Sequence, residues 1–379
     1  MRQCFSIGLF ALLVLSLPGC GGFRDTKPQL PGNLDTLCMP DYASGFEMYR
    51  YDSSTLLRIV NPWQGADSVS QWVFLSRDDE KPPKGFAGET IDVPVRRIVC
   101  MSSSYVAFLE ALGADSTICA ISGTGYIWSD KVRNRIAGGE IAEAGFDNSL
   151  NFEKLVALKP DVVFLYGLTG KNAVTDKLHE LGLKTVYIGD YVENNPLGRA
   201  EWITVFGEFT GRRELARTLF DSISNEYNRA KALVSGVEKR PEVMLNAPWQ
   251  DSWFVPGDRS YMVRLLEDAG GNYACRGVDS DQSRPISTET AFVAASQSDF
   301  WLSPGTATSL AELNAMNPRF GSIPPVRNGN VYNNNARQTP AGGSDFWESG
   351  VVRPDLVLRD LRTIFSGDSV PTCYYKRLE

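Results

Sequence analysis

The chain has 379 residues, of which 43% are hydrophobic and 22% charged, and its formal net charge at pH 7 is −7. That length exceeds what one ordinary hydrophobic core holds, so we expect two domains. The negative charge argues against nucleic acid as a partner. The single histidine, His179, excludes a multi-histidine metal site and weakens the case for Ser-His or Cys-His catalysis.

The first 20 residues predict a lipoprotein signal peptide. Arg2 supplies a positive charge, and the apolar run over residues 7–17 is too short to span a bilayer. The sequence Leu-Pro-Gly-Cys then ends at Cys20 and resembles the bacterial lipobox, in which the cysteine is lipidated and becomes the new N-terminus. The alternative is an ordinary secretory signal with a chance cysteine.

The lipobox implies that Cys20 anchors the mature chain without spanning the membrane, on the periplasmic or extracytoplasmic face of the cell envelope. Residues 21–37 contain several glycines and prolines and are expected to form a flexible tether.

Short strands follow at residues 46–51, 56–60 and 71–75, where β-branched and aromatic residues gather. They predict an antiparallel β decoration over residues 38–93, closed by the stretch 77–90, which is rich in proline, glycine and charge.

From residue 94 onward, strand and helix patterns alternate, which predicts an α/β fold with parallel sheets. Two segments, 94–196 and 238–379, show a similar order of elements and are expected to form two Rossmann-like lobes. In the first lobe we expect strands at 97–101, 117–121, 161–165 and 185–188 and helices at 105–112, 152–158 and 171–181. In the second we expect strands at 242–245, 300–302 and 331–332 and helices at 261–269, 288–295, 309–315 and 354–365.

Between the lobes, residues 197–237 predict linking helices, because apolar residues recur there at spacings of three and four. Gly211 interrupts the pattern, and the second helix should run for about 24 residues, or about 36 Å. We interpret this segment as a rigid helix joining two lobes with a cleft between them. The alternative is a core helix of one large domain.

The sequence N-F-E-K-L-V-A-L-K-P-D-V-V at residues 151–163, and a weaker copy at 286–302, carry a family resemblance. Over residues 94–367 the chain resembles the substrate-binding proteins of ABC importers for ferric siderophores, haem and vitamin B12, the class III periplasmic binding proteins. The resemblance implies a monomeric, non-enzymatic protein without a cofactor, which captures a small-molecule metal chelate and delivers it to a permease and its ATPase. A ferric siderophore is the first choice of ligand, and a corrinoid or haem is the alternative.

The same resemblance implies that Glu153 and Glu289, each near the start of an outer helix, dock against arginines of the permease. A helix dipole favours an acid in the first turn, and glutamate–arginine pairs set orientation and association rate. Glu348 is a second choice for a docking or ligand-facing carboxylate.

Ligand-binding residues are expected in cleft loops at the carboxyl ends of strands. Aromatic rings suit a large, flat chelate, and an arginine suits an anionic group on it. The candidates are Tyr126, Trp128, Phe146, Tyr166, Trp249, Trp253, Phe346, Trp347 and Arg337.

The sequence also leaves three other classes of protein open. A hydrolytic lipoprotein would need a nucleophile elbow, but the sequence contains no G-x-S-x-G, and His179 is expected at a solvated helix end. A metallocluster protein would need grouped cysteines, but the seven cysteines show no C-x-x-C spacing. A structural adhesin is the fallback. A disulfide between Cys38 and Cys373, near opposite ends of the folded part, is a further open alternative.

Overall fold

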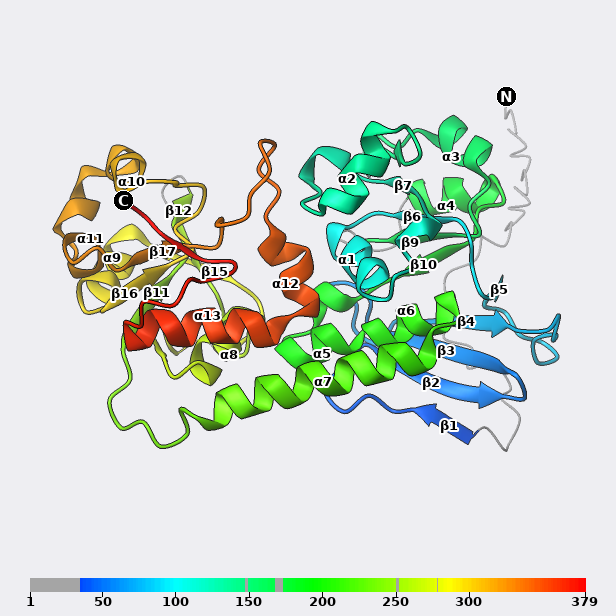
Figure 1. Ribbon diagram of the computed structural model, residues 1–379, viewed down its shortest axis with the longest axis horizontal. Coiled ribbons are helices and arrows are strands. Elements are labelled where there is room, and N and C mark those ends of the chain that lie inside the picture. Colours follow the sequence, from blue (N-terminus) through cyan, green and yellow to red (C-terminus); the bar gives the residue numbers. More distant parts are fainter. Residues whose placement is uncertain (1–34, 147–148, 168–172, 250–251, 278) are drawn as a thin grey trace, which may run out of the picture.

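The computed structural model describes residues 35–146, 149–167, 173–249, 252–277 and 279–379. The predicted signal peptide and lipidation at Cys20 lie outside these residues and stay predictions. Two α/β lobes lie side by side above a layer of helices, and a β-sheet lies beneath the first lobe (Figure 1). The predicted architecture of two lobes, a helical linker and a β decoration is therefore confirmed. None of the helices in the described part of the chain is long and apolar enough to cross a membrane.

The N-terminal sheet has five strands in the order β1-β2-β3-β4-β5. They are β1 (Asp35–Cys38), β2 (Phe46–Tyr51), β3 (Ser54–Val60), β4 (Ser70–Ser76) and β5 (Glu89–Asp92). The first four pair antiparallel, whereas β5 joins β4 in parallel. The sheet is thus not wholly antiparallel as predicted, and its first strand begins inside the predicted tether.

This sheet shares one hydrophobic core with the first lobe. Buried residues of β2, β3 and β4 belong to the same cluster as those of the linking helices, and the ring of Phe46 meets that of Trp202 edge-on at 5.1 Å. Polar contacts also join the sheet to the linking helices. Buried Glu208 accepts hydrogen bonds from Thr55 Oγ1 and Arg77 Nη2, each at 2.9 Å. The β decoration is therefore fixed to the first lobe.

The first lobe is built on a parallel sheet in the order β10-β9-β6-β7-β8. Its strands are β6 (Ile98–Cys100), β7 (Ile118–Ile121), β8 (Ala142–Glu143), β9 (Val162–Leu165) and β10 (Thr185–Tyr187). Its helices are α1 (Ser103–Ala111), α2 (Asp130–Ala137), α3 (Phe152–Leu158) and α4 (Ala173–Glu180). The sequence predicted these elements except β8 and α2.

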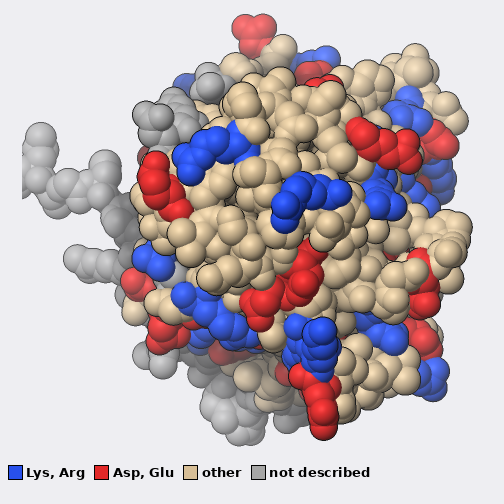
Figure 2. Space-filling view, turned by 90° about the vertical axis from the view of Figure 1, so that its left-hand side faces the viewer, with Lys and Arg blue, Asp and Glu red and all other residues tan. Residues whose placement is uncertain are grey.

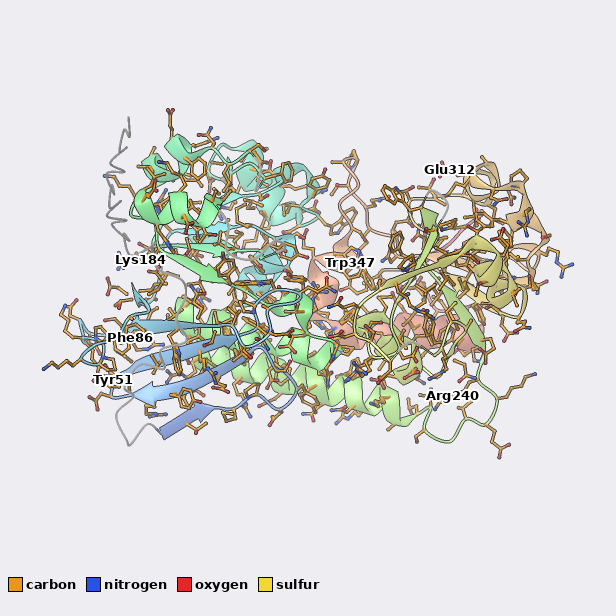
Figure 3. The ribbon with its side chains drawn as sticks, turned by 180° about the vertical axis from the view of Figure 1, so that it is seen from behind. Tyr51, Phe86, Lys184, Arg240, Glu312 and Trp347 are labelled. Atoms are coloured by element: carbon orange, nitrogen blue, oxygen red, sulfur yellow. The ribbon has the colours of Figure 1, made fainter. Side chains whose placement is uncertain are left out.

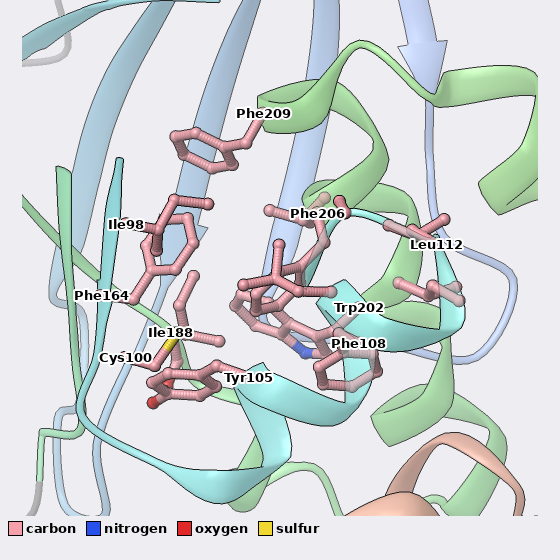
Figure 4. Close-up of a cluster of buried hydrophobic side chains, with 14 of the residues drawn as sticks. Ile98, Cys100, Tyr105, Phe108, Leu112, Phe164, Ile188, Trp202, Phe206 and Phe209 are labelled. Atoms are coloured by element: carbon pink, nitrogen blue, oxygen red, sulfur yellow. The ribbon is translucent and has the colours of Figure 1, made fainter. Parts of the chain in front are cut away.

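Aromatic rings fill the core between this sheet and the linking helices (Figure 4). Phe206 stacks on Phe108 at 4.8 Å and meets Phe164 edge-on at 5.2 Å. All three rings are fully buried. Burying such large side chains contributes about 1.5–3 kcal/mol each.

The second lobe holds a sheet in the order β14-β11-β16-β17-β18 and a smaller antiparallel one in the order β12-β13-β15. The strands of the larger sheet are β11 (Glu242–Leu245), β14 (Asn272–Tyr273), β16 (Phe300–Leu302), β17 (Val331–Asn333) and β18 (Lys376–Arg377). Those of the smaller sheet are β12 (Pro248–Trp249), β13 (Ser252–Val255) and β15 (Arg284–Ser287). The helices of this lobe are α8 (Tyr261–Asp268), α9 (Thr288–Ser296), α10 (Leu310–Met316), α11 (Pro324–Arg327) and α13 (Pro354–Ser366), whereas α12 (Ser349–Val352) packs on the first lobe.

The linking segment forms α5 (Pro196–Glu201), α6 (Ile203–Thr210) and α7 (Arg213–Ala232). The chain turns back at Gly211, whose φ of 69° is in the left-handed region that glycine tolerates. Helix α7 has 20 residues, or about 30 Å, and runs beneath both lobes (Figure 1). Its Phe220 packs in the first-lobe core and its Tyr227 in the second-lobe core.

Two more segments cross between the lobes. In α5, Leu197 belongs to the second-lobe core and Ala200 to the first-lobe core. The second is the segment 334–352, here called the C-terminal crossing. Its Phe346 packs in the second lobe, whereas Val351 and Val352 of α12 are buried in the first. The sequence placed all of residues 238–379 in the second lobe, so this return crossing is a difference from the prediction.

Candidate ligand-binding site

A pocket of about 680 Å³ opens where the two lobes and the N-terminal sheet meet. Its walls come from the β3–β4 loop, the segment between β10 and α5, and second-lobe residues that follow β11 and precede α8. Trp347 reaches it from the C-terminal crossing, and it lies between the lobes when the molecule is seen from behind (Figure 3). The pocket thus sits at the carboxyl ends of parallel strands, where α/β folds bind ligands.

Arg199 of α5 is the one basic side chain among the described residues that line the pocket, and it is only 8% exposed. The helix begins favourably, with Asn195 as the cap and Pro196 in its first turn. The guanidinium carbon lies 5.4 Å from the centre of the Tyr261 ring and 5.8 Å from that of Trp347. Two pocket-lining rings therefore hold the guanidinium in place by cation–π contact.

Asp190 forms an ion pair with Arg199. Its Oδ2 lies 3.2 Å from Arg199 Nε, and the side chain is fully buried. Burial raises the pKa of Asp190 above its ordinary value, and the charge of Arg199 opposes that shift. Arg199 Nε donates its hydrogen bond to Asp190. The two Nη groups of the guanidinium can therefore serve as two coplanar donors to ligand oxygens in the pocket.

Neutral polar groups make up much of the remaining wall. They are the amides of Asn61, Gln64, Asn194, Asn246 and Gln282 and the hydroxyls of Ser260 and Ser283. The buried Ser260 Oγ has no hydrogen-bond partner among the described residues. Such a group is stabilised when a ligand supplies the missing bond.

The pocket is not equipped to hold a bare metal ion. Its lining residues include no histidine or cysteine, and burial raises the pKa of Tyr261 to about 12, against the opposing charge of Arg199. Tyr261 therefore stays a neutral phenol near pH 7. Within the described ranges, no group of three His, Cys, Asp or Glu side chains is arranged to bind a metal.

Of the nine predicted ligand residues, Trp347 lines the pocket, with 42% of the residue exposed. Tyr166 lies directly behind the wall and packs against pocket residue Tyr191, with ring centres 4.3 Å apart.

Three predicted aromatic residues gather at a second place on the first lobe. Tyr126 and Phe146 are exposed and contact each other, with ring centres 6.3 Å apart. Thr339, from the loop of the C-terminal crossing, donates to Gly125 O at 3.0 Å beside them. Trp128 follows, with its ring under Arg133 at 5.5 Å. These residues are brought together, but they do not line the pocket.

The remaining four candidates lie elsewhere in the second lobe. Trp253 and Phe346 are core residues, and Trp253 Nε1 donates to Leu245 O at 3.0 Å, so we correct their assignment to the cleft. Trp253 points inward because alternate residues of β13 face the core. Trp249 is 67% exposed on β12, outside the pocket. Arg337 already pairs with Asp345 at 3.1 Å.

Sequence reasoning missed several pocket residues, among them Arg199, Tyr261, Tyr191 and Trp63. Arg199 had a recognisable signal, because it stands in the first turns of a helix that is otherwise mostly apolar. Trp63 had a weaker one, as an aromatic residue between two predicted strands.

The two predicted docking glutamates are both exposed in first helical turns. Glu153 follows the cap Asn151 of α3, and Glu289 follows the cap Ser287 of α9. Figure 1 shows these helices on the outer flanks of the two lobes. Their docking role stays a prediction.

Glu348 differs from both roles proposed for it. It is only 2% exposed, and it accepts hydrogen bonds from Trp128 N at 2.7 Å and Ser129 N at 2.9 Å. Those donors lie at the start of α2 in the first lobe, where a carboxylate satisfies the free amides of a helix N-terminus. Glu348 therefore latches the C-terminal crossing to the first lobe.

His179 and Cys373 do not line the pocket. His179 lies in the last turn of α4, as predicted, with Nε2 2.6 Å from Thr185 Oγ1 and outside the pocket. Cys373 is a free thiol among the described residues, and the side chain of Cys38, with which a disulfide was considered, lies outside what the structure describes. On the end face of the second lobe, basic and acidic side chains are interspersed among neutral ones (Figure 2). That face offers no basic stripe for nucleic acid.

The sequence profile of a known family, described as periplasmic binding protein, matches residues 98–337. The chain belongs to the periplasmic binding protein family. This confirms the resemblance seen in the sequence. Since these proteins bind ligands and catalyse no reaction, it also confirms the prediction of a non-enzymatic protein without a cofactor.

Individual relatives agree with this membership. An uncharacterized lipoprotein of Methanocaldococcus jannaschii is 26% identical, and the alignment covers 96% of this chain and 93% of that protein. Among solved structures, a periplasmic haem-binding protein of Pseudomonas aeruginosa has a TM-score of 0.57 at 18% identity, with 75% of this chain and 98% of that one covered. A periplasmic vitamin B12-binding protein of Vibrio cholerae has a TM-score of 0.52 at 13% identity, with 72% and 97% covered. At these identities the structures share the fold.

Proposed function

We propose that this protein is the lipid-anchored substrate-binding component of an ABC importer, and that it carries a metal chelate in the pocket between its lobes. The observation that carries the proposal is the placement of Arg199, held between the rings of Tyr261 and Trp347 inside an inter-lobe pocket. A guanidinium fixed in this way binds ligand oxygens, such as those of a carboxylate, a hydroxamate or a phosphate.

The pocket chemistry favours a chelate whose metal is already fully coordinated. A volume of about 680 Å³ suits a small-molecule ligand. Haem usually takes an axial ligand from the protein, and the neutral phenol of Tyr261 is a poor one. A ferric siderophore therefore remains the first choice and a corrinoid the second. The haem- and vitamin B12-binding neighbours support the general class.

Titration of the purified protein tests this proposal. Ferrichrome, ferric citrate, cyanocobalamin and haemin are added in turn, and intrinsic tryptophan fluorescence is recorded. Trp63 and Trp347 line the pocket, so a bound chelate quenches their emission. Saturable quenching by one of the siderophores is the expected result. Absence of saturable quenching by all four probes would refute the proposal.

The docking role is tested separately with Glu153→Gln and Glu289→Gln. Because both side chains lie on outer helices, the double variant should bind the chelate like the wild type but lose uptake into vesicles that contain the permease. Glu214→Gln is the matched control, since Glu214 is an exposed first-turn glutamate of α7. Loss of chelate affinity in the double variant, or full uptake, would contradict docking through these residues.

A further inference from the structure

One wall of the pocket comes from a segment outside the part of the chain that matches the family. The β3–β4 loop, residues 61–69, belongs to the N-terminal sheet, whereas the family match begins at residue 98. Residues 61 and 63–67 of this loop line the pocket. The loop therefore adds to the binding site something that the family fold alone does not supply.

The loop is held in one shape by its own hydrogen bonds. Asn61 N donates to Val69 O at 2.8 Å, and Asn61 Oδ1 accepts from Val69 N at 3.1 Å. Within the loop, Ala66 N donates to Trp63 O at 3.0 Å, and Gly65 takes a φ of 81°, which glycine adopts without strain. The loop is thus preorganised.

The loop is also fastened to the first lobe. Trp63 meets the ring of Tyr187 edge-on at 5.0 Å, and Gln64 N donates to the hydroxyl of Tyr191 at 3.3 Å. At the start of β4, Gln71 Nε2 donates to Thr185 O at 2.9 Å, and Gln71 Oε1 accepts from Tyr187 N at 2.9 Å. These contacts make the loop a fixed part of the first-lobe side of the pocket.

The pocket is polarised from its floor to its rim. Arg199 and Glu193 are buried in the pocket wall, whereas Gln64 and Asp67 of the loop are exposed at the rim, as are Asp281 and Gln282 of the second lobe. Both sides of the rim therefore offer one carboxylate and one amide. The exposed carboxylates accept hydrogen bonds only, in contrast to the buried donor Arg199. The buried carboxylate of Glu193 already accepts hydrogen bonds from Ser44 N, Gly45 N and Trp202 Nε1.

We propose that the β3–β4 loop is a specificity-determining wall, which selects chelates that carry N–H donors at the end opposite their Arg199-bound oxygens. Gln64 and Asp67 accept hydrogen bonds from these groups. Amide-bearing chelates such as ferrichrome and cyanocobalamin fit this pattern, whereas ferric citrate, which has no N–H group, does not. The inference rests on the proposed function and narrows its substrate class.

The test compares the full chain with the double variant Gln64→Ala, Asp67→Asn. Affinities for ferrichrome, cyanocobalamin and ferric citrate are measured by tryptophan fluorescence. The double variant should bind the amide-bearing probe that the wild type binds best at least about tenfold more weakly. The hydrogen bond to Gln64 is lost, and the bond to residue 67 loses the strength that the carboxylate charge gives it. Any affinity for ferric citrate should stay unchanged.

Asp79→Asn is the matched control, because Asp79 is an exposed aspartate of the same sheet domain that does not line the pocket. Its φ of 58° suits asparagine. If the wild type binds an amide-bearing probe and the double variant binds it with the same affinity, the proposed role of the loop is wrong, while the proposed function still holds. A wild type that binds ferric citrate more tightly than both amide-bearing probes would also overturn it. A wild type that binds no probe would overturn both.

Discussion

At the residue scale, the buried pair of Arg199 and Asp190 combines two tasks. Arg199 supplies the donor that a chelate needs, and it also compensates a fully buried carboxyl group. Removing one member of a buried ion pair is costly because it leaves the other without a partner. A simple substitution of Arg199 would therefore confuse lost binding with lost stability.

We predict that Arg199→Met lowers the free energy of unfolding by about 3–5 kcal/mol, because Asp190 loses its cation. Adding Asp190→Asn should restore most of that stability. Chelate affinity should fall at least about tenfold in both variants, since neither has the guanidinium. Urea unfolding and fluorescence titration measure the two quantities. Wild-type affinity in the stable double variant would show that Arg199 does not contact the ligand.

The sequence predicted the right kind of ligand residue more often than the right position. Trp347 was placed correctly, whereas Trp253, from a similar aromatic stretch, is in the core. The difference lies in the register of β13, which turns Trp253 inward and is set by pairing with β15. Arg199 was missed because its contacts with Tyr261 and Trp347 join residues far apart in the chain.

At the element scale, the C-terminal crossing depends on Glu348. Burial raises the pKa of this carboxyl to about 7, although hydrogen bonds from Trp128 N and Ser129 N oppose the shift. The negative charges nearby are Asp345, which pairs with Arg337, and Glu110 of α1, which accepts from Ser129 Oγ at 2.8 Å.

The raised pKa predicts how this latch responds to pH. The folded protein holds the Glu348 proton more tightly than the unfolded chain, whose glutamate titrates near 4.5. Protonated Glu348 therefore contributes to the free energy of unfolding. This contribution is fully present below pH 4.5, is lost as the pH rises to about 7, and amounts to at most about 3 kcal/mol.

Glu348→Gln should therefore flatten the fall in unfolding free energy between pH 5 and pH 7.5, as measured by urea denaturation. Glu214→Gln, an exposed change, is the control and should keep the wild-type slope. An unchanged slope in the Glu348 variant would contradict the buried, proton-binding latch.

Long elements with clear periodicity were predictable, whereas short ones were not. The strands β9 and β11 and the helices α7 and α13 carry enough apolar pattern in their own residues. In contrast, β8, β12 and β18 have two residues each, and α12 has four. Such elements exist because distant segments pair with or pack on them, which no local pattern reveals.

At the scale of the whole molecule, three segments cross between the lobes. Besides α7, both α5 and the C-terminal crossing bury side chains in both cores. Since packed interiors resist deformation, these crossings should hold the lobes at a nearly fixed separation. The β3–β4 loop further fixes one wall of the pocket.

We predict that ligand binding moves the backbone around the pocket by no more than about 1 Å, as in other preorganised complexes, and leaves the radius of gyration unchanged within measurement error. Small-angle X-ray scattering of the protein with and without saturating chelate measures the radius of gyration in the two states. A large compaction on binding would show that the lobes move as they do around a flexible hinge.

The two lobes and their helical linker were predictable because alternating strands and helices, and a long apolar period, are properties of continuous sequence. The return of α12 to the first lobe was not, since Val351 and Val352 fit either core by composition. The attachment of the N-terminal sheet was likewise hidden, because it depends on contacts such as Thr55 with Glu208 across 153 positions.

The most direct test of the account is a crystal structure of the protein with its tightest-binding chelate. We expect the ligand between the lobes, with an oxygen within hydrogen-bond distance of Arg199 Nη and its surface against Trp347. A ligand bound elsewhere, for example over Tyr126 and Phe146, would contradict the proposed site.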